Sequence, residues 1–338
     1  MNTKREIVDV FDGRPGDDSP PPAVFTKTGT VGQMDACGAR WPDANFELDA
    51  MVTLALQFPR MFGFATVRVP YCLTVEASTL GATVYPGRGD SQPSITGSPF
   101  IGESDMGVPM PPTDLMDPDE FVVSGRCAMV VDAVERISRE HEDLFLTAGM
   151  VDPIGIVAEL LGIENVVIGH LMDPDATKAW VKAMAPYSCS YAKALSEHAD
   201  NITIIGSASL DIFTPEMYDD LTAPYLREQI SNISCFSTVH SCGTTMDLID
   251  ELVKLGADGL SLEASSGPEE FLDKVAGRCL MFGSVNPIYT LLMGTAADVT
   301  AEARKDAELG FDIITPECGV PPMTPNENLM ALSNYRGE

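Results

Sequence analysis

Positive charge and histidine are both scarce in this sequence of 338 residues. It holds 21 lysine and arginine residues against 50 aspartate and glutamate residues, and only 4 histidines, so its net charge is -29. A field of this sign repels nucleic acid and anionic membranes, and we expect neither as a partner. Most of the negative charge is expected to keep the surface hydrated. An anionic small substrate would therefore need a local cation.

Long apolar runs are also missing. The longest, such as 127–134 and 144–151, are far shorter than the roughly 20 residues of a transmembrane helix. Residues 1–13 contain no apolar stretch of the signal-peptide type. We therefore expect a cytoplasmic protein, in which the 8 cysteines are free thiols or ligands rather than disulfides.

Short β-type runs alternate with amphipathic helical stretches along most of the chain. This alternation predicts βαβ units and a parallel sheet. Eight such runs favour an α/β fold of the closed (β/α)8 TIM-barrel type over an open sheet. The predicted strands are 23–29, 65–70, 143–149, 201–207, 235–240, 259–263, 278–285 and 311–318.

Two segments exceed a minimal barrel. Residues 1–20 form a predicted N-terminal helical extension, and residues 85–120 form a long insertion rich in proline, glycine and aspartate after the second strand. A loop of that length either has a function, such as docking or closing over the site, or covers the side of the barrel. No internal repeat or linker divides the sequence, so we expect one domain over 1–338.

Chemically capable side chains stand at the ends of the later strands. His240 and Cys242 end the fifth predicted strand and Glu263 ends the sixth, while Asn286 follows the seventh and Cys318 follows the eighth. TIM barrels carry their catalytic groups at the C-terminal ends of the strands. We therefore expect these five residues to meet at one rim.

A metal site is the favoured interpretation of this group. Residues i and i+2 at a strand end point to the same side, so His240 and Cys242 can bind one ion together. Zinc prefers nitrogen and sulfur ligands, and catalytic zinc sites keep one position open. Cys318 is the expected third ligand, and Glu263 can fill the fourth position until a substrate displaces it.

Other interpretations of the cysteines are less favoured than the metal site. A cysteine is most often a small buried apolar side chain, which suits the other cysteines in apolar patterns. A disulfide between Cys242 and Cys318 is disfavoured in a reducing compartment. A protease dyad of His240 and Cys242 is disfavoured because the pair leaves no space for a substrate carbonyl. Those other cysteines are Cys127, Cys189, Cys235 and Cys279.

Several motifs carry a family resemblance. VHSCGTT (239–245), FGSVNPIYTLLMGT (282–295) and TPECGVPPMTPNENLMAL (315–332) resemble segments of the uroporphyrinogen decarboxylase superfamily. They are most similar to its methylcobamide:coenzyme M methyltransferase branch, as are 26–44 and 67–87 in the N-terminal half. The resemblance extends over nearly the whole chain.

The resemblance implies a catalytic zinc held by His240, Cys242 and Cys318, with Glu263 near the metal. It implies methyl transfer from a methylcobamide, carried on a partner corrinoid protein, to the thiol of coenzyme M. Only a thiolate is a good nucleophile, and zinc deprotonates a thiol that coordinates it.

The acceptor stays open at this point, because tetrahydrofolate or another thiol would serve the same chemistry. A non-catalytic corrinoid binder stabilised by zinc is a further alternative. A decarboxylase of the uroporphyrinogen type is disfavoured, since 26–33 lacks the arginines that hold porphyrin carboxylates in that branch. For the sulfonate of coenzyme M we expect Arg68 and Lys27 as cations, with Tyr71 and Asn286 lining the same pocket.

Overall fold

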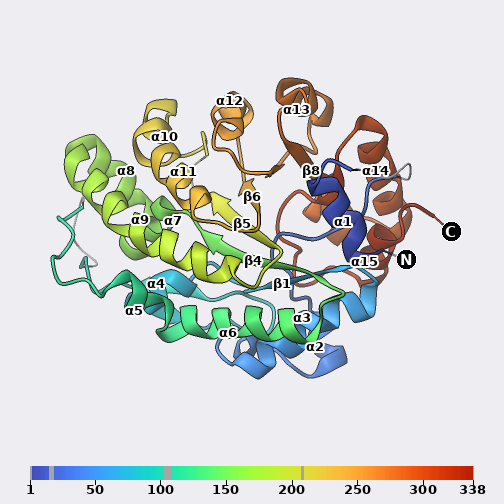
Figure 1. Ribbon diagram of the computed structural model, residues 1–338, viewed down its shortest axis with the longest axis horizontal. Helices are drawn as coiled ribbons and strands as arrows, with labels where there is room; N and C mark the ends of the chain where they lie inside the picture. The colour runs from blue at the N-terminus through green and yellow to red at the C-terminus, as the bar shows by residue number, and fades with distance from the viewer. Residues whose placement is uncertain (1, 15–18, 103–107, 207–208, 338) are drawn as a thin grey trace.

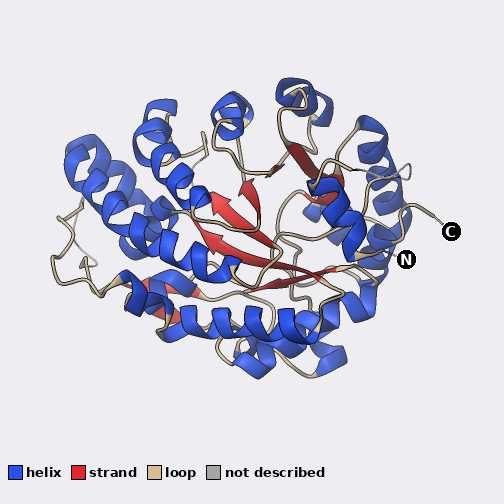
Figure 2. Cartoon of the chain, in the orientation of Figure 1, coloured by secondary structure: helices blue, strands red, loops and turns tan. Residues whose placement is uncertain are grey.

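Parallel strands surrounded by helices make up the architecture of the computed structural model, which describes residues 2–14, 19–102, 108–206 and 209–337 (Figure 1). The strands lie at the centre and the helices outside (Figure 2). The sheet has the order β1-β4-β5-β6-β7-β8-β9, and every neighbouring pair is parallel. This is the predicted TIM-barrel-like α/β fold. Its strands are β1 (Thr66–Val69), β4 (Phe145–Val151), β5 (Asn201–Gly206), β6 (Phe236–Ser241), β7 (Gly259–Leu262), β8 (Leu280–Val285) and β9 (Ile313–Pro316).

The first predicted strand, 23–29, is the exception. It is reduced to one parallel bridge between Pro22 and Ile314 of β9. The Ala23 amide donates to the Ile314 carbonyl at 2.9 Å, and the Val24 amide donates to the Thr66 hydroxyl of β1 at 3.2 Å. The segment thus lies between β9 and β1, where an eighth strand would stand. No regular ladder forms with β1, because the Val24 amide bonds the Thr66 side chain rather than a backbone carbonyl of that strand.

Helices connect and cover the strands. The long helices α3, α6, α9 and α14 have apolar faces on the sheet, as the amphipathic pattern predicts. The helices are α1 (Lys4–Phe11), α2 (Val31–Cys37), α3 (Leu48–Phe62), α4 (Val75–Thr79), α5 (Pro118–Val122), α6 (Gly125–Glu140), α7 (Pro153–Leu161), α8 (Ile163–Met172), α9 (Pro174–Ser196), α10 (Pro215–Leu221), α11 (Ala223–Ser231), α12 (Ile249–Val253), α13 (Pro268–Val275), α14 (Ala296–Leu309) and α15 (Asn326–Ser333). Single turns are η1 (Asp43–Asn45), η2 (Met246–Leu248) and the π-helical η3 (Pro287–Leu292).

The N-terminal extension closes one end of the barrel. Its helix α1 starts at a capping box, in which Thr3 and Glu6 bond each other's backbone. At its end, the Phe11 ring stacks on Phe236 at 4.5 Å and meets Phe282 edge-on at 5.3 Å. Both partners lie at or near the N-terminal ends of their strands, so a functional site must lie at the opposite end.

The insertion 85–120 is more ordered at its start than the sequence indicates. Strands β2 (Thr83–Tyr85) and β3 (Ser94–Gly97) form an antiparallel hairpin separate from the main sheet. Residues 103–107 lie outside the described part of the chain. Further along, the Trp180 indole of α9 donates to the Pro109 carbonyl at 2.6 Å. The described end of the insertion is therefore fixed to α9.

No described helix is by itself long and apolar enough to cross a membrane. Helices α7 and α8 are bent by 101° where they join. Taken together they have the length and the apolar composition of a membrane span, and no other feature of the described residues indicates one.

Candidate metal centre

His240 and Cys242 stand together at the C-terminal end of β6. Phe236, Thr238 and His240 lie on one side of this strand, because side chains alternate along it, and they lead from the closed end to the open end. His240 is only 2% exposed. Its Nε2 atom lies 3.1 Å from the Sγ atom of Cys242, which follows the strand.

The turn after Cys242 requires a glycine. Gly243 has a φ of +73°, and a Cβ atom there would lie 2.1 Å from a carboxylate oxygen of Asp211. That carboxylate accepts bonds from the amide and hydroxyl of Thr244, at 2.8 and 2.7 Å. The tight turn thus fixes the chain directly after the Cys242 thiol.

Cys318 joins the pair from the segment after β9. Its Sγ atom lies 3.4 Å from that of Cys242. One potential ligand atom from each of His240, Cys242 and Cys318 lies within 4.8 Å of the other two, so the three residues could hold one metal ion. A disulfide would bring the sulfurs to about 2.05 Å, so the two cysteines are free thiols here.

These three donors suit zinc. One imidazole nitrogen and two sulfurs are the borderline-soft ligands that zinc favours, and three protein ligands are typical of a zinc site that keeps a position for substrate. The histidine is buried and the two cysteines are half-buried, so the group can be reached from one side.

The two thiols share their protons unequally. The hydrogen bond from Cys242 to Cys318 lowers the pKa of Cys318 and raises that of Cys242. Burial also raises the pKa of Cys242. A cation that binds both sulfurs would displace the proton that they share in this hydrogen bond.

Glu263 lies next to the group but outside it. It follows β7, is half-buried, and its carboxylate hydrogen-bonds the Cys242 thiol, which further raises the pKa of that thiol. It is not among the residues whose ligand atoms are mutually close. A hollow beside it is lined by Gly243, Thr244 and Glu270. Its role as a fourth ligand stays a prediction.

Two neighbours of the group escaped the sequence patterns. Ser261 of β7 stands opposite His240 in the strand register, and its Oγ lies 3.1 Å from His240 Nδ1. Thr26 donates its hydroxyl to the Cys318 carbonyl at 2.8 Å. No sequence pattern marks either residue, since the Ser261 contact depends on the pairing of β6 with β7 and the Thr26 contact on the approach of two irregular segments.

Lys27 lies beside the third ligand. Its side chain packs where a Cβ atom of Gly319 would be, with the nearest carbons at 2.5 Å, and its Nζ donates to Gln92 at 3.1 Å. Within the described chain it forms no ion pair. It is therefore a cation beside Cys318 that no carboxylate of the described residues neutralises.

Arg68 is a buried cation on β1. It is 3% exposed, its Nη1 donates to the Pro70 carbonyl, and its guanidinium covers Gly149, where a Cβ atom would lie 2.0 Å from Nη2. Its Nε has no hydrogen-bond partner among the described groups. Burial lowers the pKa of Arg68 to about 10. The structure does not bring it into contact with the three ligands.

Tyr71 and Asn286 have structural partners. Tyr71 is fully buried, and its hydroxyl donates to the Met51 carbonyl at 2.8 Å, so the structure places it in the core rather than in a pocket. The Asn286 amide donates to Ser265 at 3.0 Å and to Glu317 at 2.9 Å. Asn286 thus joins loops at the open end of the barrel.

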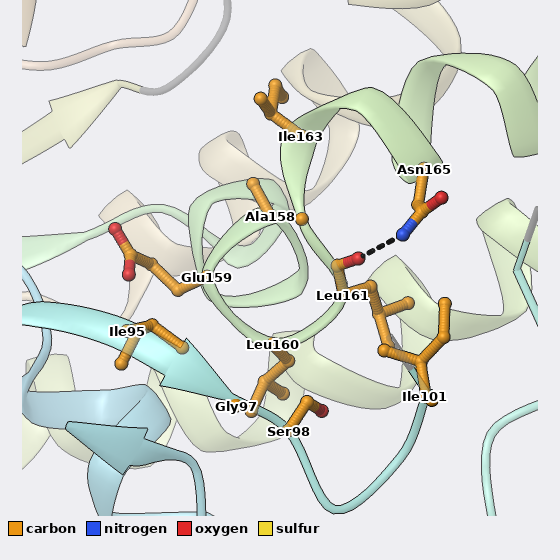
Figure 3. Close-up of a pocket in the computed structure, with 12 residues that line it drawn as sticks. Ile95, Gly97, Ser98, Ile101, Ala158, Glu159, Leu160, Leu161, Ile163 and Asn165 are labelled. Carbon is orange, nitrogen blue, oxygen red and sulfur yellow. Dashed lines mark hydrogen bonds between the residues drawn. The ribbon is translucent and has the colours of Figure 1, made fainter. Parts of the chain in front are cut away.

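Another hollow lies between β3 and the junction of α7 and α8 (Figure 3). Its lining is mainly apolar, with Ile95, Ile101 and Leu160, and it includes the carboxylate of Glu159. Burial raises the pKa of Glu159 to about 7. None of the predicted site residues lines this hollow.

Comparison with known proteins shows the family of the chain. The profile of the uroporphyrinogen decarboxylase (URO-D) family matches residues 2–338. The chain belongs to the uroporphyrinogen decarboxylase family. Within that family, it is 30% identical over 340 residues to a methylcobamide:CoM methyltransferase, MtaA, of Methanosarcina barkeri, covering 99% of this chain and 97% of the relative. It is 28% identical to an MtbA methyltransferase of Methanosarcina acetivorans, covering 94% of each chain.

A solved structure supports the same assignment. A methyltransferase from Methanosarcina mazei superimposes with a TM-score of 0.90 at 29% identity, covering 99% of this chain and 98% of the other. The protein is therefore a methyltransferase of the uroporphyrinogen decarboxylase family, as the sequence motifs predict.

Proposed function

We propose that the protein transfers a methyl group from a methylated corrinoid protein to the thiol of coenzyme M, with one zinc ion held by His240, Cys242 and Cys318. The observation that carries the proposal is the approach of these three ligand atoms to within 4.8 Å at the open end of the barrel. The similarity to methylcobamide:CoM methyltransferases suggests the methyl donor and the class of acceptor.

The three proposed zinc ligands and Glu263 together prepare the site for the thiol of the acceptor. A zinc ion in this site would keep the acceptor's thiol deprotonated at neutral pH. Three protein ligands leave one position for a sulfur from the substrate. The Glu263 carboxylate, beside Cys242, can occupy that position in the absence of a thiol.

The transfer itself is a displacement at the methyl carbon. The thiol gives its proton to solvent, and its sulfur then attacks the methyl group. The S–C bond forms as the Co–C bond breaks, and the electron pair of that bond stays on cobalt, which passes from Co(III) to Co(I). The products are a methyl thioether and the demethylated corrinoid protein, and no protein nucleophile takes part.

The anionic end of coenzyme M needs a cation in this acidic protein. Lys27, beside the Cys318 segment, has no carboxylate partner among the described residues, and the buried Arg68 has an Nε without a hydrogen-bond partner. We assign Lys27 to the sulfonate, with Arg68 as the second cation on the neighbouring strand. A buried charge of this kind is costly unless a ligand pairs with it.

The acceptor is tested by methyl transfer from free methylcobalamin to coenzyme M, homocysteine and tetrahydrofolate, with zinc-loaded protein. We expect the highest rate with coenzyme M, a lower rate with homocysteine and none with tetrahydrofolate. Transfer to tetrahydrofolate alone would contradict thiol activation, and carbon dioxide release from uroporphyrinogen would contradict methyl transfer as the main reaction.

A further inference from the structure

Glu317 is a buried carboxylate adjacent in sequence to the third ligand. It is 5% exposed and accepts three hydrogen bonds. The Ser265 amide donates to it at 2.7 Å, the Ser265 hydroxyl at 2.8 Å and the Asn286 amide at 2.9 Å. Among the described residues it has no lysine or arginine partner, so these bonds are what offset the burial of its charge.

The partners of Glu317 belong to two other loops. Ser265 follows β7 and stands two residues after Glu263, while Asn286 follows β8. The Asn286 side chain in turn accepts bonds from the first amides of η3, those of Ile288 at 3.0 Å and Tyr289 at 2.8 Å. One carboxylate therefore connects the segments that follow β7, β8 and β9.

The Cys318 segment has few other supports. Strand β9 ends at Pro316, so Cys318 lies beyond the ladder. On its far side, the Thr26 hydroxyl donates to the Cys318 carbonyl at 2.8 Å, and the Val320 amide donates to the Lys27 carbonyl at 2.9 Å. On the side that faces β7 and β8, the Glu317 amide donates to the Val285 carbonyl at 3.0 Å, and the Glu317 carboxylate accepts the remaining bonds.

The bonding pattern requires an acceptor at this place. All three partners of Glu317 are donors, and a carboxylate accepts on both oxygens. A glutamine of the same shape would turn one N–H₂ group toward a donor. Charge alone would favour a neutral residue, since burial of a second carboxylate near Glu263 is costly.

We propose that Glu317 is a positioning residue, which holds Cys318 at the distance from His240 and Cys242 that a shared metal ion requires. Through Ser265 it also fixes the segment that carries Glu263. The proposal rests on the proposed metal site, and it is independent of which thiol accepts the methyl group.

The test is a double-mutant cycle read out by metal binding. In Glu317→Gln we expect the dissociation constant for zinc to rise about 10- to 100-fold, as for other supporting partners of metal ligands. The thiolate charge-transfer and d–d bands of the Co²⁺-substituted protein are expected to change, since the position of Cys318 sulfur changes. Adding Asn286→Asp supplies an acceptor for the side-chain amide of the introduced glutamine. The aspartate also still accepts from the backbone amides of η3. The double variant is therefore expected to recover most of the zinc affinity.

A matched control and a stability measurement complete the experiment. Glu308→Gln removes one carboxylate from an exposed helix face and is expected to leave zinc affinity and the Co²⁺ spectrum unchanged. Thermal unfolding of the metal-free variants separates loss of fold from loss of position. Wild-type affinity and spectrum in Glu317→Gln would overturn the proposal, as would a loss that Asn286→Asp fails to restore. Failure of the wild type itself to bind zinc would instead overturn the proposed function.

Discussion

The Nδ1 atom of His240 lies 3.1 Å from the hydroxyl of Ser261, while its Nε2 atom lies 3.1 Å from the sulfur of Cys242. The two residues stand opposite each other in the register of β6 and β7. When Nδ1–H donates to the hydroxyl, the lone pair of Nε2 is left facing the two sulfurs. The serine thus orients the ring so that Nε2 faces the sulfurs, as binding of a metal ion would require.

Ser261→Ala is expected to weaken zinc binding about tenfold, because the imidazole loses the partner that orients it. Zinc titration against a competing chelator measures the change. Ser237→Ala is the matched control, since Ser237 is a buried serine near the start of β6, the strand that carries His240, and its hydroxyl donates to Asp258. Equal affinities in Ser261→Ala and the wild type would contradict an orienting role.

Lys27→Met is expected to raise the KM for coenzyme M about tenfold, with little change in kcat, because a charge-assisted bond to the sulfonate is lost. The KM for 2-mercaptoethanol, which has the same thiol without the anion, is expected to stay constant. Lys182→Met, on an exposed face of α9, controls for the loss of one cation. A parallel rise for both thiols would show that Lys27 does not recognise the anion.

The buried carboxylate of Glu76 is expected to make the free energy of unfolding depend on pH. It is 2% exposed, and burial raises its pKa to about 7 from 4.5, although the Val151 amide bonds it at 2.9 Å. Because the folded state holds the proton more tightly, this group stabilises the fold most below about pH 4.5, and the stabilisation declines as the pH rises through 7.

Glu76→Gln keeps an acceptor for the Val151 amide and removes the titration. The variant is expected to exceed the wild type in free energy of unfolding at pH 8, by on the order of 3 kcal/mol, and to lose that advantage toward pH 4.5. Urea unfolding across this range measures the difference. A gap between the two proteins that does not vary with pH would contradict a buried, titrating carboxylate.

The grouping of His240, Cys242 and Cys318 could be predicted from the sequence because each residue lies at or shortly after the end of a strand. His240 and Cys242 are spaced to point the same way, and parallel strands bring Cys318 to the same rim. The strand predicted at 23–29 is reduced to a bridge at Pro22, because the Val24 amide bonds a side chain of β1 rather than a backbone carbonyl.

Contacts between loops and helices could not be predicted from the sequence. Tyr71 was expected near the substrate, yet its hydroxyl reaches the Met51 carbonyl of α3, a contact that depends on how the helix packs. Glu317 and Ser265 carry no pattern of their own, since their pairing follows from the approach of two irregular segments. The strands can be predicted from local periodicity, whereas contacts between loops and helices form only when the barrel closes.

Zinc content per chain, measured on purified wild type and Cys318→Ala, tests the central claim most directly. Cys279→Ala is the matched control, because Cys279 is a half-buried cysteine outside the ligand group. The account predicts about one zinc per chain in the wild type and the control, and little or none in Cys318→Ala, since loss of one of three protein ligands sharply weakens the site. The same zinc content in Cys318→Ala as in the wild type would contradict it.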